Sequence, residues 1–133
     1  MPAKNLHRYK TNTLEMTEDS IVCFRSEADD VYTDKDLIEI LDIAEKIASK
    51  KPFLLLMVIN EFEFLMTKEA REIFNTYEKA IKLIKAEAVV VNSIPTKIMY
   101  NLVAMLHAPK FPLKAFTTET EAVEWLLKYN EAD

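Results

Sequence analysis

The chain contains no glycine among its 133 residues, although roughly nine would be expected at the usual frequency of about 7%. Glycine is the residue that lets a backbone adopt positive φ or approach a ligand closely. A P-loop, a G-x-G-x-x-G dinucleotide turn, a G-x-S-x-G elbow and an EF-hand loop all require it. The sequence therefore excludes these common sites for phosphate, nucleotide and calcium.

Cysteine and long apolar runs are also scarce, and acidic residues outnumber basic ones by 22 to 17. Cys23 is the only cysteine, so an internal disulfide cannot form and a reducing cytoplasm is the expected setting. The net charge of −5 opposes a phosphate backbone, so nucleic acid is not an expected partner. The apolar run from Phe53 to Ile59 is far too short to span a membrane, and residues 1–10 do not resemble a signal peptide. We expect a soluble, cytoplasmic protein.

The composition fits one globular domain over residues 1–133, since 50% of the chain is apolar and 29% is charged. Two strands are predicted first, Leu6 to Met16 and Ile21 to Ser26, joined by a polar turn over residues 17–20. Residues 1–11 have a second interpretation, as a flexible N-terminal extension. Continuous apolar runs at 53–59 and 88–91 predict central strands, and Pro112 to Phe116 predicts a short strand at a sheet edge.

Four amphipathic helices alternate with these later strands. Their expected N-terminal residues are Thr33, Thr67, Ser93 and Thr118. The apolar stripe of the second helix runs as far as Ile84, and Pro52 and Pro109 follow the first and third helices. The alternation predicts an α/β fold with a mixed, mainly parallel sheet of about five strands and four helices.

The order of elements and several short segments resemble the SpoIIAA-like (STAS/SEC14-like) family of small bacterial proteins over about residues 12–128. The segments are Ser20-Ile21-Val22-Cys23-Phe24, Lys51-Pro52-Phe53, Glu69-Ala70-Arg71, Ala86-Glu87-Ala88-Val89-Val90-Val91, and Ala115-Phe116-Thr117 with Glu121-Ala122-Val123-Glu124-Trp125-Leu126. The resemblance implies a SpoIIAA/STAS-like fold and a non-enzymatic binding or regulatory domain. Related SEC14-type folds carry apolar ligands, which keeps a carrier function open.

The phosphorylation switch of that superfamily is not present in its usual form. In anti-sigma-factor antagonists the helix after the central strand begins Asp-Ser-Ser-Gly, and a serine there is phosphorylated. Thr67 stands near the corresponding position here, but Lys68 and Glu69 replace the second serine and the glycine. The resemblance therefore implies binding without this switch motif.

A polar site is expected to lie where ligands gather in open α/β sheets, beyond the carboxyl ends of the strands. The candidates there are Asn60, Glu61, Asn92, Ser93 and Thr117. Helix capping is the simpler explanation for Ser93 and for Thr118. The two histidines have no third ligand at a suitable spacing, so we expect no metal and no cofactor. Cys23 is interpreted as a small buried hydrophobic residue, and we assign no catalytic residue.

An apolar surface is the more prominent candidate. Seven apolar residues of the third helix spread over roughly 180°, more than the ~100° that a surface helix needs, with Tyr100 and Ala104 on the far side. These residues are Ile94, Ile98, Met99, Leu102, Val103, Met105 and Leu106. The loop before the second helix adds Phe62, Phe64 and Met66. A core role and an interface role are both open for these side chains.

From these patterns we predict a regulatory or protein-interaction module that binds a protein partner or itself, with a homodimer as the expected assembly. The binding candidates are Phe62, Phe64, Met66, Met99, Leu102, Val103 and Leu106. The alternative is a carrier or sensor of a small apolar, lipid-like molecule, and an enzyme of unknown reaction comes third.

Overall fold

The structure is a computed structural model that describes residues 4–9, 12–17, 19–26, 31–59, 65–66, 72, 77–107 and 110–130. For residues 4–9, 12, 31–32, 65–66, 103 and 106–107 the description covers the backbone alone.

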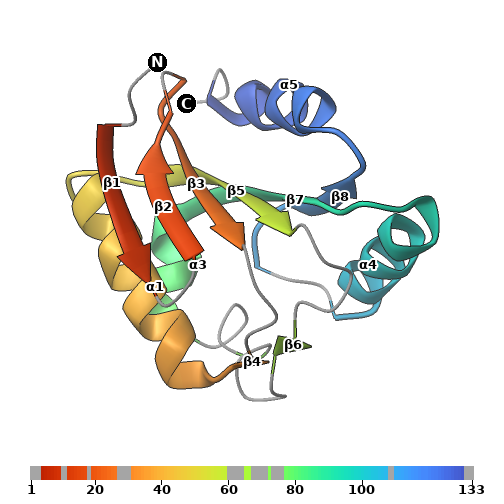
Figure 1. The fold of residues 1–133 in the computed structure, drawn as a ribbon, viewed down its shortest axis with the longest axis horizontal. Helices are drawn as coiled ribbons and strands as arrows, with labels where there is room; N and C mark the ends of the chain where they lie inside the picture. The colour runs from red at the N-terminus through yellow and green to blue at the C-terminus, as the bar shows by residue number, and fades with distance from the viewer. Residues whose placement is uncertain are drawn as a thin grey trace.

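Six of the described strands form one sheet in the order β1-β2-β3-β5-β7-β8 (Figure 1). β1 (Lys4–Tyr9), β2 (Asn12–Met16) and β3 (Ile21–Ser26) are antiparallel neighbours. β5 (Phe53–Ile59), β7 (Ile84–Val90) and β8 (Leu113–Phe116) then join in parallel. Separately, β4 (Val31–Tyr32) and β6 (Leu65–Met66) form a short parallel pair. The predicted mixed, mainly parallel α/β fold is confirmed.

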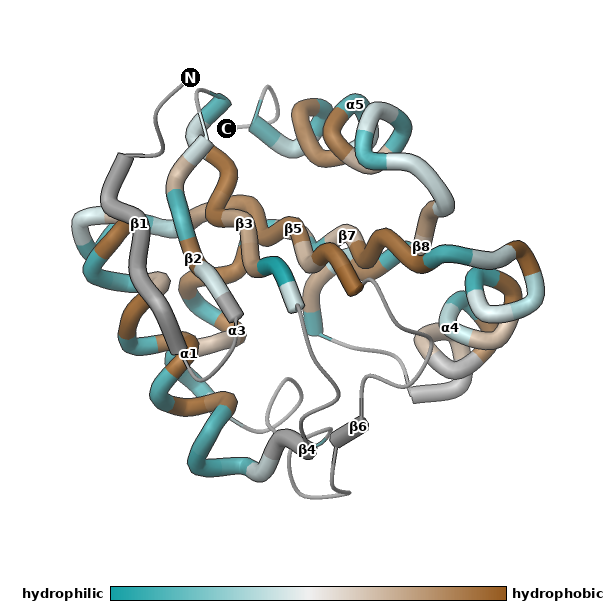
Figure 2. The backbone as a smooth tube through the Cα atoms, in the orientation of Figure 1, coloured by the Kyte–Doolittle hydropathy of each residue, from teal (hydrophilic) through white to brown (hydrophobic). Residues whose placement is uncertain are grey.

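The helices lie on both faces of the sheet and at one edge (Figure 1). α1 (Asp34–Ile47) and α3 (Glu78–Leu83) pack on one face, and α5 (Glu119–Asn130) packs on the other. α4 (Ile94–His107) lies beside the edge strand β8. All seven side chains of β5 are buried, as its unbroken apolar sequence predicts for a central strand (Figure 2).

Both ends of α1 are closed by hydrogen-bonding motifs that form here without glycine. At its start, Thr33 and Asp36 form a reciprocal capping box. At its end, the N–H of Lys50 donates to the Glu45 carbonyl at 2.8 Å, and that of Ser49 donates to the Lys46 carbonyl at 3.1 Å. This is a Schellman motif, in which glycine usually takes the left-handed position.

Among the described residues, left-handed backbone occurs at two serines and one lysine. Ser49 and Lys50 have φ of 56° and 64°, and Ser20, in the turn before β3, has φ of 63°. A side chain with a Cβ makes this conformation unfavourable by roughly 1–2 kcal/mol per residue relative to glycine. The fold therefore stores a small strain at the end of α1 and in the turn between β2 and β3.

The first predicted strand, over residues 6–16, is wrong as a single element. It is divided into β1 and β2, which pair antiparallel with Tyr9 opposite Asn12. Residues 4–9, within the stretch also interpreted as an extension, thus form an edge strand of the sheet. The polar break after Tyr9 contains neither glycine nor proline, so the usual turn signal is missing from the sequence.

The predicted helix through Tyr77 to Ile84 is also wrong at both of these residues. Tyr77 has extended backbone, with ψ of 108°, and precedes α3 as its N-cap residue. Ile84 begins β7 and pairs with Phe53, so the strand predicted at 88–91 starts four residues earlier. An apolar residue at helical spacing satisfies either element, and pairing with β5 decides the outcome here.

Candidate functional site

α4 is preceded by the capping residue Ser93 and lies against the edge strand β8. Oγ of Ser93 accepts a hydrogen bond from the Thr96 N–H at 3.3 Å, so Ser93 caps the helix. About two turns after Ser93, Oδ1 of Asn101 accepts from the Ala115 N–H at 2.7 Å, and Nδ2 donates to the Ala115 carbonyl at 3.3 Å. The Asn101 amide therefore forms the two hydrogen bonds with Ala115 that the backbone of a further strand beside β8 would form.

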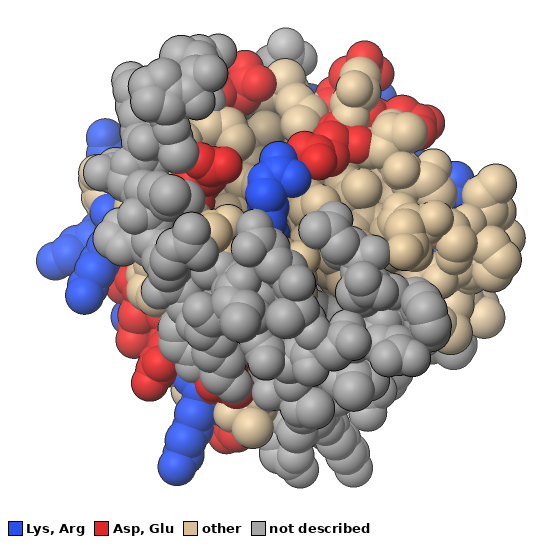
Figure 3. All heavy atoms as spheres, in the orientation of Figure 1, with Lys and Arg blue, Asp and Glu red and all other residues tan. Residues whose placement is uncertain are grey.

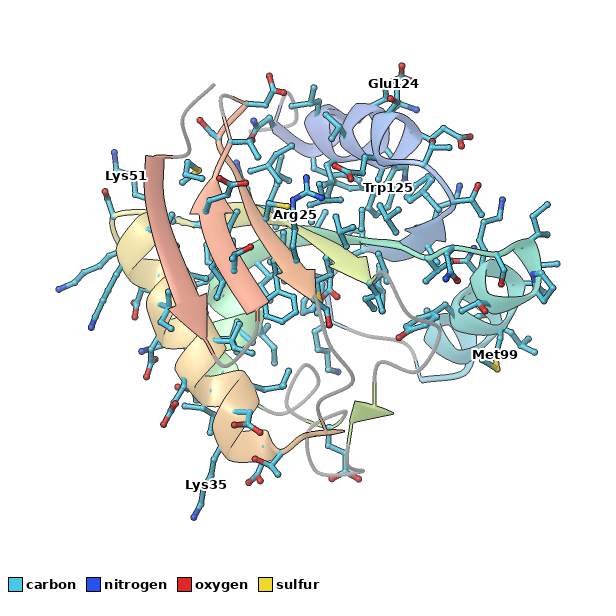
Figure 4. All side chains as sticks on the ribbon, viewed as in Figure 1. Arg25, Lys35, Lys51, Met99, Glu124 and Trp125 are labelled. Carbon is cyan, nitrogen blue, oxygen red and sulfur yellow. The ribbon has the colours of Figure 1, made fainter. Side chains whose placement is uncertain are left out.

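The opposite side of α4 exposes a continuous set of apolar side chains, which we call the α4 face. It consists of Ile94 (62% exposed), Ile98 (60%), Met99 (57%), Leu102 (50%) and Met105 (71%). Within the described part of the chain, these are the large hydrophobic residues that remain exposed. Figure 3 shows this region, at the right, as a surface with little charge, and Figure 4 shows Met99 on its outer side. A cluster of this kind on one helix makes the α4 face the candidate interaction surface of the described chain.

The side of α4 that faces the sheet differs from the side expected from the sequence. Tyr100, expected on the far side of the helix from the sheet-packing arc, packs against the buried core, while five members of that arc point outward. The reason is the pairing of Asn101 with β8, because satisfying backbone groups at a sheet edge fixes which side of the helix faces inward.

The remaining apolar candidates are not placed as side chains. Phe62 and Phe64 lie outside the described residues, and Met66 is described only as backbone of β6. Val103 and Leu106 belong to α4, also as backbone alone.

The polar candidates are only partly described. Asn60 and Glu61 lie outside the described residues, as does Thr67, whereas Asn92 and Thr117 follow the paired strands β7 and β8 at the same edge of the sheet. Asn92 is exposed and Thr117 is half-buried.

Next to Thr117, the Thr118 hydroxyl accepts from the Glu121 N–H at 3.2 Å, which gives Thr118 the capping role expected from the sequence.

An ion pair joins the first residue of α5 to the sheet. Arg25 on β3 donates two hydrogen bonds to the Glu119 carboxylate, at 2.8 and 2.9 Å (Figure 4). Hydrogen bonding to Glu119 raises the pKa of Arg25, and the same contact lowers the pKa of Glu119. The partners are 94 residues apart, so sequence spacing gave no signal of this pair.

Cys23 lies in the core beneath α5 on the same face of the sheet. Burial raises the pKa of its thiol to about 11. The thiol is therefore protonated at neutral pH, and its packing agrees with the interpretation of Cys23 as a small hydrophobic residue.

A buried acid, Glu87, lies in the middle of β7 on the face covered by α1 and α3. Among the described residues, its Oε1 is the buried side-chain atom with no hydrogen-bond partner. Burial raises the pKa of Glu87 to about 8. The pKa of Tyr100 on α4 rises to about 12, through its own burial and then through the nearby Glu87. Glu87 was not expected as a buried acid because the strand was predicted to begin at Ala88. An acidic residue directly beside an apolar run is the sequence signal that indicates a buried carboxyl group here.

The described ranges contain no group of three or more histidine, cysteine, aspartate or glutamate side chains arranged to hold a metal ion. None of the described helices is both long and apolar enough to cross a membrane.

Comparisons with known proteins give a family and a fold. Residues 15–130 match the family model described as a domain of unknown function, DUF7793. A solved structure of an uncharacterised DUF3478 family protein with a SpoIIAA-like fold, from Shewanella loihica PV-4, matches with a TM-score of 0.54 and 14% identity. The match covers 91% of this chain and 90% of that chain. A search of curated proteins gave no match. The expected SpoIIAA-like fold is confirmed.

Proposed function

The chain belongs to the DUF7793 family and has a SpoIIAA-like fold, and from this premise we propose that it is a non-enzymatic, regulatory interaction module that self-associates through the α4 face. The observation that carries the proposal is the exposure of five large apolar side chains on one helix of the described chain. A soluble domain that kept these side chains in water permanently would lose the stabilisation that burial provides.

The size of this apolar face is sufficient for reversible pairing. Complete burial of an isoleucine, leucine or methionine side chain contributes about 1.5–3 kcal/mol, and these residues are half to seven-tenths exposed. In a two-fold symmetric dimer each of these residues is buried once in each subunit. The gross gain in binding free energy is therefore on the order of 10 kcal/mol or more. Association costs about 4–15 kcal/mol, so the net affinity falls in a weak to micromolar range.

Charge favours a second copy at this face over other parts of the surface. The molecule carries a net charge of −5, so two copies repel each other over most approaches. The sequence of α4 contains no aspartate or glutamate, and Lys97 is its only lysine or arginine. Two acidic molecules therefore meet here with little repulsion, and the same apolar patch serves both partners.

The non-enzymatic part of the proposal is supported by the state of the polar groups that are described. The Cys23 thiol is buried and protonated, and Arg25 and Glu119 bind each other. Glu87 lies within the core and not at an open surface. This set provides no activated nucleophile beside a base.

The test is sedimentation equilibrium of the wild-type chain and the variants Met99→Asp and Leu102→Asp, with Thr120→Asp as a control. Thr120 is exposed on α5, so its variant makes the same charge change away from the α4 face. We expect reversible dimers for the wild type and the control, and at least a 100-fold weaker dimer for both α4 variants, because a charge would be buried in the interface.

Thermal unfolding followed by circular dichroism shows whether these variants remain folded. Variants that unfold as monomers would show that the side chains belong to the core, and variants that dimerise like wild type would show that the interface lies elsewhere. Native mass spectrometry of the purified protein adds one further contrast. A monomer that retains a mass of a few hundred daltons would overturn self-association in favour of the apolar-ligand carrier.

A further inference from the structure

Glu87 lies on β7, the neighbour of the strand β8 that α4 contacts. Its neighbours across the sheet are Leu55 on β5 and Leu113 on β8, both apolar. Its backbone N–H donates to the Pro112 carbonyl at 2.8 Å, which ties it to the start of β8. From α4 the nearby titratable group is Tyr100, which packs against the same core. The acid thus lies among apolar strands, near the inward-facing Tyr100 of the helix that carries the exposed face.

The described ion pairs of α1 and α3, the helices that cover this face of the sheet, do not include Glu87. On α3, Lys79 binds Asp42 and Glu45 of α1, at 3.0 and 2.9 Å, and Lys82 binds Glu78 at 3.2 Å. Among the described groups, burial is the influence that acts on Glu87. A neutral carboxylic acid tolerates this environment, whereas a carboxylate with no partner at Oε1 requires water or a conformational change.

We propose that Glu87 is a proton-controlled lock beneath α4, whose neutral form keeps the helix seated on β8 and whose ionised form loosens it and weakens pairing through the α4 face. The effect on pairing rests on the function proposed above. The lock itself does not, because it concerns only the attachment of α4.

α4 is attached so that it can move in response without disrupting the sheet. The strands around Glu87 are held by the hydrogen bonds of the sheet, whereas α4 is attached at the edge through Tyr100 and the Asn101–Ala115 bonds. Displacing an edge helix admits water to the carboxylate without breaking the ladder. Since the pKa of Glu87 is about 8, the transition lies just above neutral pH.

The first experiment measures backbone amide exchange in α4 at pH 6.5 and pH 9, corrected for the intrinsic pH dependence of exchange. The wild type and Glu87→Gln are compared at a concentration where the chain is monomeric, with α5 as an internal reference. We expect wild-type α4 protection to fall at least tenfold relative to α5 between these pH values, and Glu87→Gln to show no such loss. Glu87→Leu serves the same purpose if the glutamine variant does not fold.

Two results would overturn the lock: equal changes in α4 and α5 of the wild type, or the same selective loss in the variants without an acid. Sedimentation equilibrium over the same pH range separates the lock from the proposed function. A selective loss of α4 protection in a chain that never dimerises would retain the lock and refute the interface. A dimer whose dissociation constant and α4 protection both stay constant from pH 6.5 to 9 would refute the lock alone.

Discussion

Replacing Glu87 with glutamine should remove a pH-dependent loss of stability that burial imposes on the folded chain. An ordinary glutamate has a pKa of 4.5, and burial raises that of Glu87 to about 8. Between these values the unfolded chain is ionised while the folded chain still binds the proton. The free energy of unfolding therefore falls as the pH rises from 4.5 to about 8, and this contribution is constant above that.

The magnitude follows from the two pKa values. Each pH unit of this window corresponds to about 1.36 kcal/mol, which gives an upper limit of about 5 kcal/mol for the whole effect and about 3 kcal/mol at pH 7. Glutamine has nearly the shape of the neutral acid and cannot ionise. Glu87→Gln should therefore be more stable than wild type at pH 8, by an amount that largely disappears at pH 5.

Urea denaturation followed by the fluorescence of Trp125 provides the assay, at pH 5, 6, 7 and 8 and at low protein concentration. Trp125 is suitable because it packs on the sheet from α5, at a ring-centroid distance of 5.6 Å from Phe116. Glu124→Gln, an exposed substitution on α5, controls for the loss of one acid. The gap between Glu87→Gln and wild type should widen by about 3 kcal/mol from pH 5 to pH 8. A constant gap over this range would refute the reasoning.

Two further predictions concern the glycine-free backbone and the single thiol. Ser49→Gly should raise the free energy of unfolding by up to about 1 kcal/mol in urea denaturation, since Ser49 has φ of 56°, although the greater freedom of glycine in the unfolded chain offsets part of this gain. Unchanged or lower stability would show that the αL position is not strained. Cys23 should react with a disulfide reagent many times more slowly in the native chain than in urea, because its thiol is buried and its pKa is about 11. Rapid labelling of the native chain would contradict this burial.

The parts of the fold that could be predicted from the sequence are those fixed by local chemistry. The unbroken apolar run of β5 and the caps at Thr33, Ser93 and Thr118 depend on residues within one or two turns of each other. The division of the first strand was missed because its break lacks glycine and proline. The beginning of β7 at Ile84 was missed because pairing with β5 overrides an apolar residue at helical spacing.

The apolar residues of the candidate site on α4 could be predicted from the sequence, but the side of the helix that faces solvent could not. The excess of apolar residues on α4 was visible in the sequence, and the structure leaves five of them exposed. Which side of the helix faces inward depends on the hydrogen bonds between Asn101 and Ala115, which are a tertiary contact. The ion pair of Arg25 and Glu119 is likewise formed only once β3 and α5 have been brought together by folding.

Asn101 also limits how the sheet can grow. An edge strand with free N–H and C=O groups is a template for adding strands from other molecules, which is the first step of fibril formation. α4 covers β8, and Asn101 engages both backbone groups of Ala115, so this margin is closed to strand addition. Among the described strands, β1 forms the opposite margin. A sheet with one closed margin can add a strand from a second copy at most once, through its other margin, so the folded chain offers no template for open-ended polymerisation.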